Sequence, residues 1–327
     1  MQDLAQLAGV SISTISRALN DHPLISSRTK QRIWALAHAH DYPFRASMPI
    51  APIGSEGSIV IVTPQTRGRP LPLSHPFFLE LLACIGEAAR SHDCDFTVSH
   101  LSPVSYDDLF VASTTSRANG TIFLGQGYLH ESFNRLADQG IAFVVWGAEL
   151  PEQRYRSIGS DNFSGGKRAT DHLIRLGRRR IAFLGGTDPE AQQRCRGYIG
   201  ALERADIDFD NKRVATVEFE LDQADAAVSH MIESGVSFDA IVASSDLIAL
   251  GAIQALQRSG QTIPDDVAVV GYDDMLLSRL STPKLTTIRQ DTGQAGRLLV
   301  SSVLNSQSEH KSVRLPTELI IRGSCGA

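Results

Sequence analysis

The sequence has no long hydrophobic run. Its longest apolar stretches, residues 59–62 and 141–146, are far shorter than the roughly 18 residues that a membrane-spanning helix needs. Gln2, Asp3 and Gln6 stand where a secretory signal would place basic residues and an apolar core. The sequence therefore predicts no membrane span, and we expect a cytoplasmic protein.

Cysteine is also scarce, with four residues in the chain. Cys84, Cys94, Cys195 and Cys325 form no CxxC pair and show no spacing with histidine that is typical of a metal site. We expect four buried or inert thiols. The sequence predicts neither a metal site nor a cofactor.

Enzyme motifs are missing as well. The chain has no GxSxG, no HExxH and no GxGxxG after a strand. Gly166-Lys167 resembles part of a phosphate-binding loop, but no glycine stands five residues before Gly166, and Arg168 replaces the serine or threonine. Neighbouring acids such as Asp273 and Asp274 would point apart on a strand. We therefore expect no catalytic residues and a protein that is not an enzyme.

What is present is a soluble composition with an uneven charge. The 327 residues are 42% hydrophobic and 20% charged, and the length allows two or three domains. The net charge is −5, but residues 1–45 carry +2 and the remainder −7. A small basic segment joined to a larger acidic one indicates a nucleic-acid-binding module attached to a second kind of domain.

The first 40 residues predict three short helices, at 3–8, 12–20 and 27–40. Gly9 ends the first helix, and Ser11 can cap the second. Leu4, Leu7 and Ala8 in the first helix, and Ile15, Ala18 and Leu19 in the second, have the spacing of a buried face. Helix, tight turn and helix form a helix-turn-helix, whose second helix enters the DNA major groove. A plain three-helix cap with a polar face is the alternative.

After a linker rich in proline and glycine at residues 42–57, strands alternate with helices, which is typical of parallel α/β folds. Two such sets predict two similar lobes with a ligand cleft at the carboxyl ends of their strands. The expected strands are 59–62, 96–98, 121–124, 143–146, 181–184, 214–217, 240–242 and 267–270, and the expected helices 77–91, 167–176, 195–205, 223–234 and 247–258.

Several motifs in one order carry a family resemblance. Residues 3–20 read DLAQLAGVSISTISRALN, and Ser160-Asp161-Asn162, Ser245-Asp246, residues 269–274 and residues 285–290 follow. The chain resembles the lactose-repressor (LacI/GalR) family of bacterial transcription regulators over nearly its whole length. The resemblance implies an all-α helix-turn-helix headpiece and a body of two doubly wound parallel α/β lobes like periplasmic binding proteins. The expected parts are a headpiece at 1–44, a hinge linker at 45–57, an N-terminal lobe at 58–157 and 287–316, and a C-terminal lobe at 158–286 and 317–327.

The resemblance also implies DNA contacts in the second helix. Base-reading positions correspond to Ile12, Ser13 and Arg17, and an arginine can donate two hydrogen bonds to guanine. Ile12 could only contact a thymine methyl, and its alternative role is packing. The positions expected on phosphates and the DNA backbone are Ser11, Thr14, Ser16, Asn20 and Thr29.

The linker departs from the family pattern. Ala51 stands near the position of the leucine that wedges into the minor groove, and Pro49 and Pro52 would interrupt a helix. Met48 or Ile50 replaces the wedge, or the linker stays extended and bends the DNA less.

For the cleft, the resemblance assigns Arg194 and Asp273 to ligand hydroxyls. An arginine donor, a carboxylate acceptor and an aromatic face suit a sugar, although a structural ion pair between the lobes is the alternative. Phe77, Phe78, Trp146 and Phe219 are the expected aromatic walls, with core packing as their alternative. Asp161 and Ser245 complete the effector set, and Asp161 can instead cap a helix.

We therefore expect a homodimeric repressor of a carbohydrate-utilisation operon that binds double-stranded operator DNA. A small sugar effector would close the cleft and change operator affinity. Three alternatives remain: a purine or phosphosugar co-repressor, a sugar-binding protein without a DNA-linked role, and a sugar-modifying enzyme.

Overall fold

The computed structural model describes residues 2–19, 25–26, 29–30, 32–33, 36, 57–66, 69–70, 75–114, 118–305 and 311–327. The chain forms two compact units, Met1–Ile53 and Gly54–Ala327. Asn20, Met48, most of the expected third helix and nearly all of the expected linker lie outside the described residues. The boundary between headpiece and linker therefore stays a prediction.

The first unit contains the first two of the three predicted helices, α1 (Gln2–Ala8) and α2 (Ile12–Leu19). Gly9 joins them with a φ of +61°, a conformation that glycine adopts without a steric penalty. The core contains Leu4, Ala5, Ala8, Ile15, Ala18 and Ile33. Leu7 was expected to face this core but is 53% exposed, and Ala5 is buried in its place. The smaller side chain fits the close approach of two short helices.

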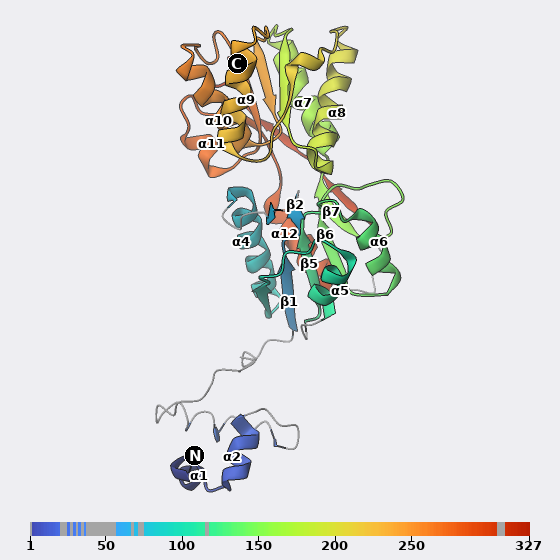
Figure 1. Ribbon diagram of the computed structural model, residues 1–327, viewed down its shortest axis with the longest axis vertical. Helices are drawn as coiled ribbons and strands as arrows, with labels where there is room; N and C mark the ends of the chain where they lie inside the picture. Colours follow the sequence, from blue (N-terminus) through green and yellow to red (C-terminus); the bar gives the residue numbers. More distant parts are fainter. Residues whose placement is uncertain are drawn as a thin grey trace. The chain divides into compact units, whose positions relative to one another are not determined.

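The second unit contains two lobes (Figure 1). The sheet of the first lobe is parallel throughout, in the order β13-β7-β6-β5-β1-β4. Alternate residues of β1 pack in two different cores: Ile59 and Ile61 in one, Val60 and Val62 in the other. The strands are β1 (Gly57–Val62), β4 (Cys94–Val98), β5 (Gly120–Leu124), β6 (Phe143–Trp146), β7 (Ser157–Ser160) and β13 (Val313–Leu315), and the helices are α4 (Pro76–Ser91), α5 (Tyr106–Thr114), α6 (His130–Asp138) and α12 (Thr292–Leu304).

The second lobe repeats this architecture in the order β14-β12-β11-β10-β8-β9, with β14 antiparallel to β12. The strands are β8 (Ile181–Gly185), β9 (Val214–Thr216), β10 (Ala240–Ala243), β11 (Ala268–Asp273), β12 (Thr286–Arg289) and β14 (Glu318–Ile320). The helices are α7 (Asn162–Arg175), α8 (Pro189–Arg204), α9 (Leu221–Glu233), α10 (Asp246–Arg258) and the short α11 (Leu276–Leu280). A 3-10 turn, η1 (Asn211–Arg213), and a small hairpin of β2 (Gln65–Thr66) and β3 (Arg69–Pro70) complete the elements that we name.

Each strand expected from an apolar run is present, with ends that differ by up to three residues. The expected lobe boundaries at 157/158 and 286/287 were wrong in detail, because both fall at strands. β7 pairs with β6 and β13 in the first lobe, and β12 pairs with β11 in the second. The chain therefore crosses between lobes after residues 160 and 289. Strand pairing determines where the chain crosses between the lobes. The sequence did not predict these two strands, because SIGS and TTIR are short and polar and contain no apolar run.

Among the described residues, no helix combines the length and the apolar character that crossing a membrane requires.

Candidate functional site

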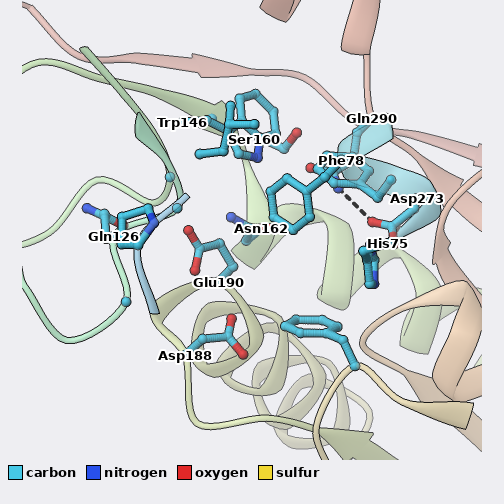
Figure 2. Close-up of a pocket in the computed structure, with 18 of the residues that line it drawn as sticks. His75, Phe78, Gln126, Trp146, Ser160, Asn162, Asp188, Glu190, Asp273 and Gln290 are labelled. Atoms are coloured by element: carbon cyan, nitrogen blue, oxygen red, sulfur yellow. Dashed lines mark hydrogen bonds between the residues drawn. The ribbon is translucent and has the colours of Figure 1, made fainter. Parts of the chain in front are cut away.

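A cavity lies between the two lobes at the carboxyl ends of their strands (Figure 2). It encloses roughly 770 Å³ of space, including its opening to solvent. The cavity is lined by residues that follow β5, β6 and β8. The last residues of β7 and β11 line it as well. In parallel sheets all these strand ends meet at one edge, so two facing lobes place them around one space.

Six of the eight effector residues predicted from the sequence line this cavity: Phe77, Phe78, Trp146, Arg194, Phe219 and Asp273. Asp161 and Ser245 do not. Asp161 caps α7 by accepting a hydrogen bond from the Ser164 amide at 3.0 Å, and Ser245 caps α10 through the Ile248 amide at 3.2 Å. Asn162, the neighbour of Asp161, lines the cavity instead.

Arg194 is held from several sides on the inner face of α8. Its Nε donates to Asn162 Oδ1 at 2.8 Å, and its Nη1 donates to the Ser244 carbonyl. The Asp273 carboxylate lies 4.0 Å from Nη1, and the guanidinium covers the ring of Tyr272. Arg194 and Asp273 both belong to the second lobe, so the alternative of an ion pair between lobes is wrong.

Asp273 occupies a backbone conformation that a non-glycine residue rarely adopts, with φ of +117°. The strain turns the chain sharply at the end of β11, and such strain is common at binding sites. Gln290 Nε2 donates to Asp273 Oδ1 at 2.7 Å. Burial raises the pKa of Asp273 to about 7, against the opposing influence of Arg194 and Gln290.

Two acids at the start of α8 were not predicted. Asp188 caps the helix through Oδ1, which accepts from the Ala191 amide at 2.9 Å, while Oδ2 is buried without a partner. Glu190 Oε1 accepts from the Ala148 amide of the first lobe at 3.0 Å. Burial, with the nearby Asp188, raises the pKa of Glu190 to about 7. Figure 2 shows the Glu190 carboxyl inside the cavity.

His75 and Gln126 were missed as well. Both ring nitrogens of His75 are buried and have no hydrogen-bond partner in the part of the chain that the structure describes, and burial lowers the pKa of His75 to about 4. Its ring meets Phe78 and Phe219 edge to face, with centroids 5.5 and 6.1 Å away. Gln126 follows β5 in a Gly-Gln-Gly sequence, which is a signal that sequence reading could have used, because a polar residue directly after a parallel strand reaches the ligand edge.

The candidate DNA-binding surface is the start of α2. Ser11 caps this helix by accepting from the Thr14 amide at 3.2 Å, and its hydroxyl also contacts those of Ser13 and Thr14 at 2.8 Å. Ile12 is 45% exposed, so it does not pack in the headpiece core. Ser13 and Arg17 are exposed too, and Ser16 is half-buried. The predicted base-reading side chains are thus accessible.

Thr29 lies at a second capped turn. The Ser26 hydroxyl accepts from the Thr29 amide at 3.2 Å and contacts the Thr29 hydroxyl at 2.8 Å. Arg32 donates to the Ala8 carbonyl at 2.6 Å, which ties this segment to the end of α1. The roles of Thr29 and the α2 residues toward DNA stay predictions.

Comparison with known proteins matches both units of the chain. Residues 1–43 match the bacterial regulatory proteins of the lacI family, and residues 170–325 match the periplasmic binding protein-like domain. The HTH-type transcriptional regulator CelR of Thermobifida fusca is 28% identical, with 99% of this chain and 97% of the relative covered. Two solved structures are similar over nearly the whole chain. The complex of CelR with cellobiose is 27% identical with a TM-score of 0.70 and 98% of each chain covered. The lac repressor dimer bound to operator and an anti-inducer is 25% identical with a TM-score of 0.74, covering 99% of this chain and 98% of that one.

The motifs of the sequence, the capped helix-turn-helix and the two-lobed body agree with these matches: the chain joins a lacI-family DNA-binding domain to a periplasmic binding protein-like domain, and over its whole length it is similar to transcription regulators with that organisation.

Proposed function

We propose that this protein is a repressor of a carbohydrate-utilisation operon whose affinity for operator DNA changes when a small sugar binds between the two lobes. The observation that carries the proposal is the cavity, where arginine and carboxyl groups meet aromatic rings. Arg194 can donate to ligand oxygens, and Asp273 can accept from hydroxyls. Phe78, Trp146 and Phe219 offer apolar surface to the C–H face of a sugar ring. The cellobiose complex of the related CelR supports this ligand class.

Both lobes would contact the same ligand. Phe78 and Trp146 come from the first lobe, and Arg194 and Asp273 from the second. A ligand that contacts both favours one interlobe angle over others, and a coupling free energy of about 1–3 kcal/mol is usual for such switches. Because the ligand contacts both lobes, it would bind one interlobe angle more tightly than another, and this difference in affinity is what the switch needs.

DNA binding would require two copies of the chain. Residues 1–45, with a net charge of +2, can neutralise few phosphates, and affinity for DNA rises with the number of phosphates neutralised. A homodimer supplies a second headpiece and reads a palindromic site. We assign Ile12, Ser13 and Arg17 to bases and Ser11, Thr14, Ser16, Asn20 and Thr29 to phosphates, with Met48 as the candidate wedge.

The proposal places the protein in the cytoplasm, where operator DNA lies, and gives it no catalytic step. Chromatography of a sugar incubated with the protein would detect any turnover. Products formed at enzymatic rates would contradict this part of the proposal and favour the sugar-modifying alternative.

The test is a thermal unfolding screen with monosaccharides, disaccharides, sugar phosphates and purines, followed by operator binding with each hit. A ligand at 100 times its dissociation constant stabilises the folded state by about 2.7 kcal/mol. We expect a sugar to raise the unfolding temperature and to weaken operator binding. A purine or phosphosugar that alone stabilises the protein and strengthens operator binding would favour a co-repressor.

A further inference from the structure

We infer that the cleft takes a neutral sugar or an amino sugar and rejects sugars that carry a carboxylate or phosphate. This inference rests on the proposed function, because it names the charge class of the same ligand. It depends on the balance of charges and on the unpartnered polar atoms around the cavity.

Arg194 is the one arginine or lysine among the described residues that line the cavity. Its charge is already balanced inside the protein, because the Asp273 carboxylate lies 4.0 Å away and the Ser244 carbonyl accepts from the same Nη1. The ring of Tyr272 covers one face of the guanidinium. An anionic ligand would therefore have to compete with Asp273 for this cation.

Three carboxyl groups, those of Asp188, Glu190 and Asp273, line the same cavity. Asp188 and Glu190 both lie at the first turn of α8, on the side of the cavity away from Asp273 (Figure 2). Above pH 7, where Glu190 and Asp273 are mostly ionised despite their raised pKa values, a carboxylate or phosphate brought between these groups would be repelled in a partly dehydrated space, where charges interact strongly. An ammonium group would instead be attracted.

Buried polar atoms without hydrogen-bond partners give an independent reason to expect a neutral or amino sugar. Gln126 is fully buried, and its Nε2 donates to the Ala148 carbonyl at 2.7 Å and to the Tyr155 hydroxyl at 2.6 Å. Among the described residues, its Oε1 has no hydrogen-bond partner, and neither does Asp188 Oδ2. Both are pure acceptors, so they need a donor from the ligand or from water.

Two further groups can take part. Ser160 Oγ and the ring nitrogens of His75 are buried without partners and line the cavity. Sugar hydroxyls and ammonium groups donate hydrogen bonds, whereas ionised carboxylates and phosphates only accept them. A ligand rich in donors therefore satisfies the cleft, and an anionic substituent leaves its acceptors unpaired.

The experiment is titration calorimetry of the full chain with matched sets of sugars. Each set contains a hexose, its 2-amino form, its uronate and its 6-phosphate, in the gluco, galacto and manno series. We expect at least one set whose neutral or amino member binds, with its anionic members about hundredfold weaker or absent. An anionic member that binds as tightly as its neutral parent would overturn the inference while leaving a sugar effector intact. Absence of binding by every member and by their disaccharides would overturn the proposed sugar effector itself.

A variant tests the role of the two acids on α8. Asp188→Asn with Glu190→Gln keeps a helix cap and an acceptor for the Ala148 amide, so the fold is retained. We expect the preference for neutral over anionic members to fall by about tenfold. Glu203→Gln, on the exposed far part of the same helix, is the matched control and should leave the preference unchanged. An unchanged preference in the double variant would contradict the assignment of selectivity to these acids.

Discussion

The guanidinium carbon of Arg194 lies 3.7 Å from the centroid of the Tyr272 ring. Both side chains are buried, and Tyr272 directly precedes Asp273 on β11. The stacking fixes the plane of the guanidinium, so its remaining donors have a defined direction toward the cavity. A flexible ammonium cannot reproduce this geometry.

Arg194→Lys should therefore weaken sugar binding by about 1.5–3 kcal/mol, because the charge is kept while the planar set of donors is lost. Operator binding without sugar should be unchanged. Sugar affinity is measured by calorimetry, and operator affinity by fluorescence anisotropy of a labelled operator. Arg204→Lys, exposed on the same helix in an ion pair with Asp171, is the control. A normal sugar response of Arg194→Lys would place the binding site elsewhere.

Arg17→Ala should lower specific operator affinity by about 1–3 kcal/mol, because the exposed Arg17 is assigned to a base. Sugar binding should be retained. Operator fragments are first selected from random duplexes. The affinity of each variant for these fragments is then measured at several salt concentrations. Arg90→Ala removes the same charge from an exposed site on α4 in the other unit and should change affinity little. Equal losses in both variants would remove the recognition role of Arg17.

Sequence reasoning found the aromatic and charged cleft residues that family motifs or strand ends mark, such as Trp146 at the end of β6 and Asp273 at the end of β11. It could not separate ligand contacts from helix caps. Asp161 and Ser245 proved to be caps, because an acid or serine before a helix has the same sequence pattern in both roles.

Residues whose role depends on the approach of the two lobes were beyond the sequence. Glu190 reaches the Ala148 amide of the other lobe, and His75 lies against Phe219 across the cavity. No local pattern encodes a contact between residues so far apart in the chain. The short strands β7 and β12 were missed for a different reason, since pairing with neighbours stabilises them more than their own apolar content does.

Gly197→Ala should destabilise the second unit by about 1–3 kcal/mol, because a Cβ there would lie 2.1 Å from the Phe163 carbonyl oxygen on α7. Gly200→Ala on the same helix is the matched control. Its Cβ would meet only the Phe163 ring at 3.6 Å, so the higher helix propensity of alanine should stabilise by about 0.5–1 kcal/mol. Urea unfolding measures both, and equal effects would contradict the close packing of α7 on α8.

The carboxyl of Glu190 should make stability depend on pH. Burial raises its pKa in the folded protein from 4.5 to about 7, so the folded state binds a proton that the unfolded state has released between these values. The free energy of unfolding contributed by this group is therefore highest below pH 4.5 and falls as the pH rises through 7. Glutamine resembles the protonated acid and carries no charge at any pH. Glu190→Gln should then unfold at nearly the wild-type temperature at pH 5 and at a higher temperature than wild type at pH 8.

The difference between variant and wild type is the quantity to follow, because other groups titrate in the same range. The raised pKa of Asp273 acts in the same direction, and the lowered pKa of His75 costs stability as the pH falls from 6.5 toward 4. Both contributions cancel when Glu190→Gln is compared with wild type by calorimetric scans at each pH. Glu203→Gln, exposed on the same helix, is the control variant. A difference for Glu190→Gln that stays constant from pH 5 to pH 8 would mean that the carboxyl is ionised throughout, and that its bond to the Ala148 amide is made by a charged group.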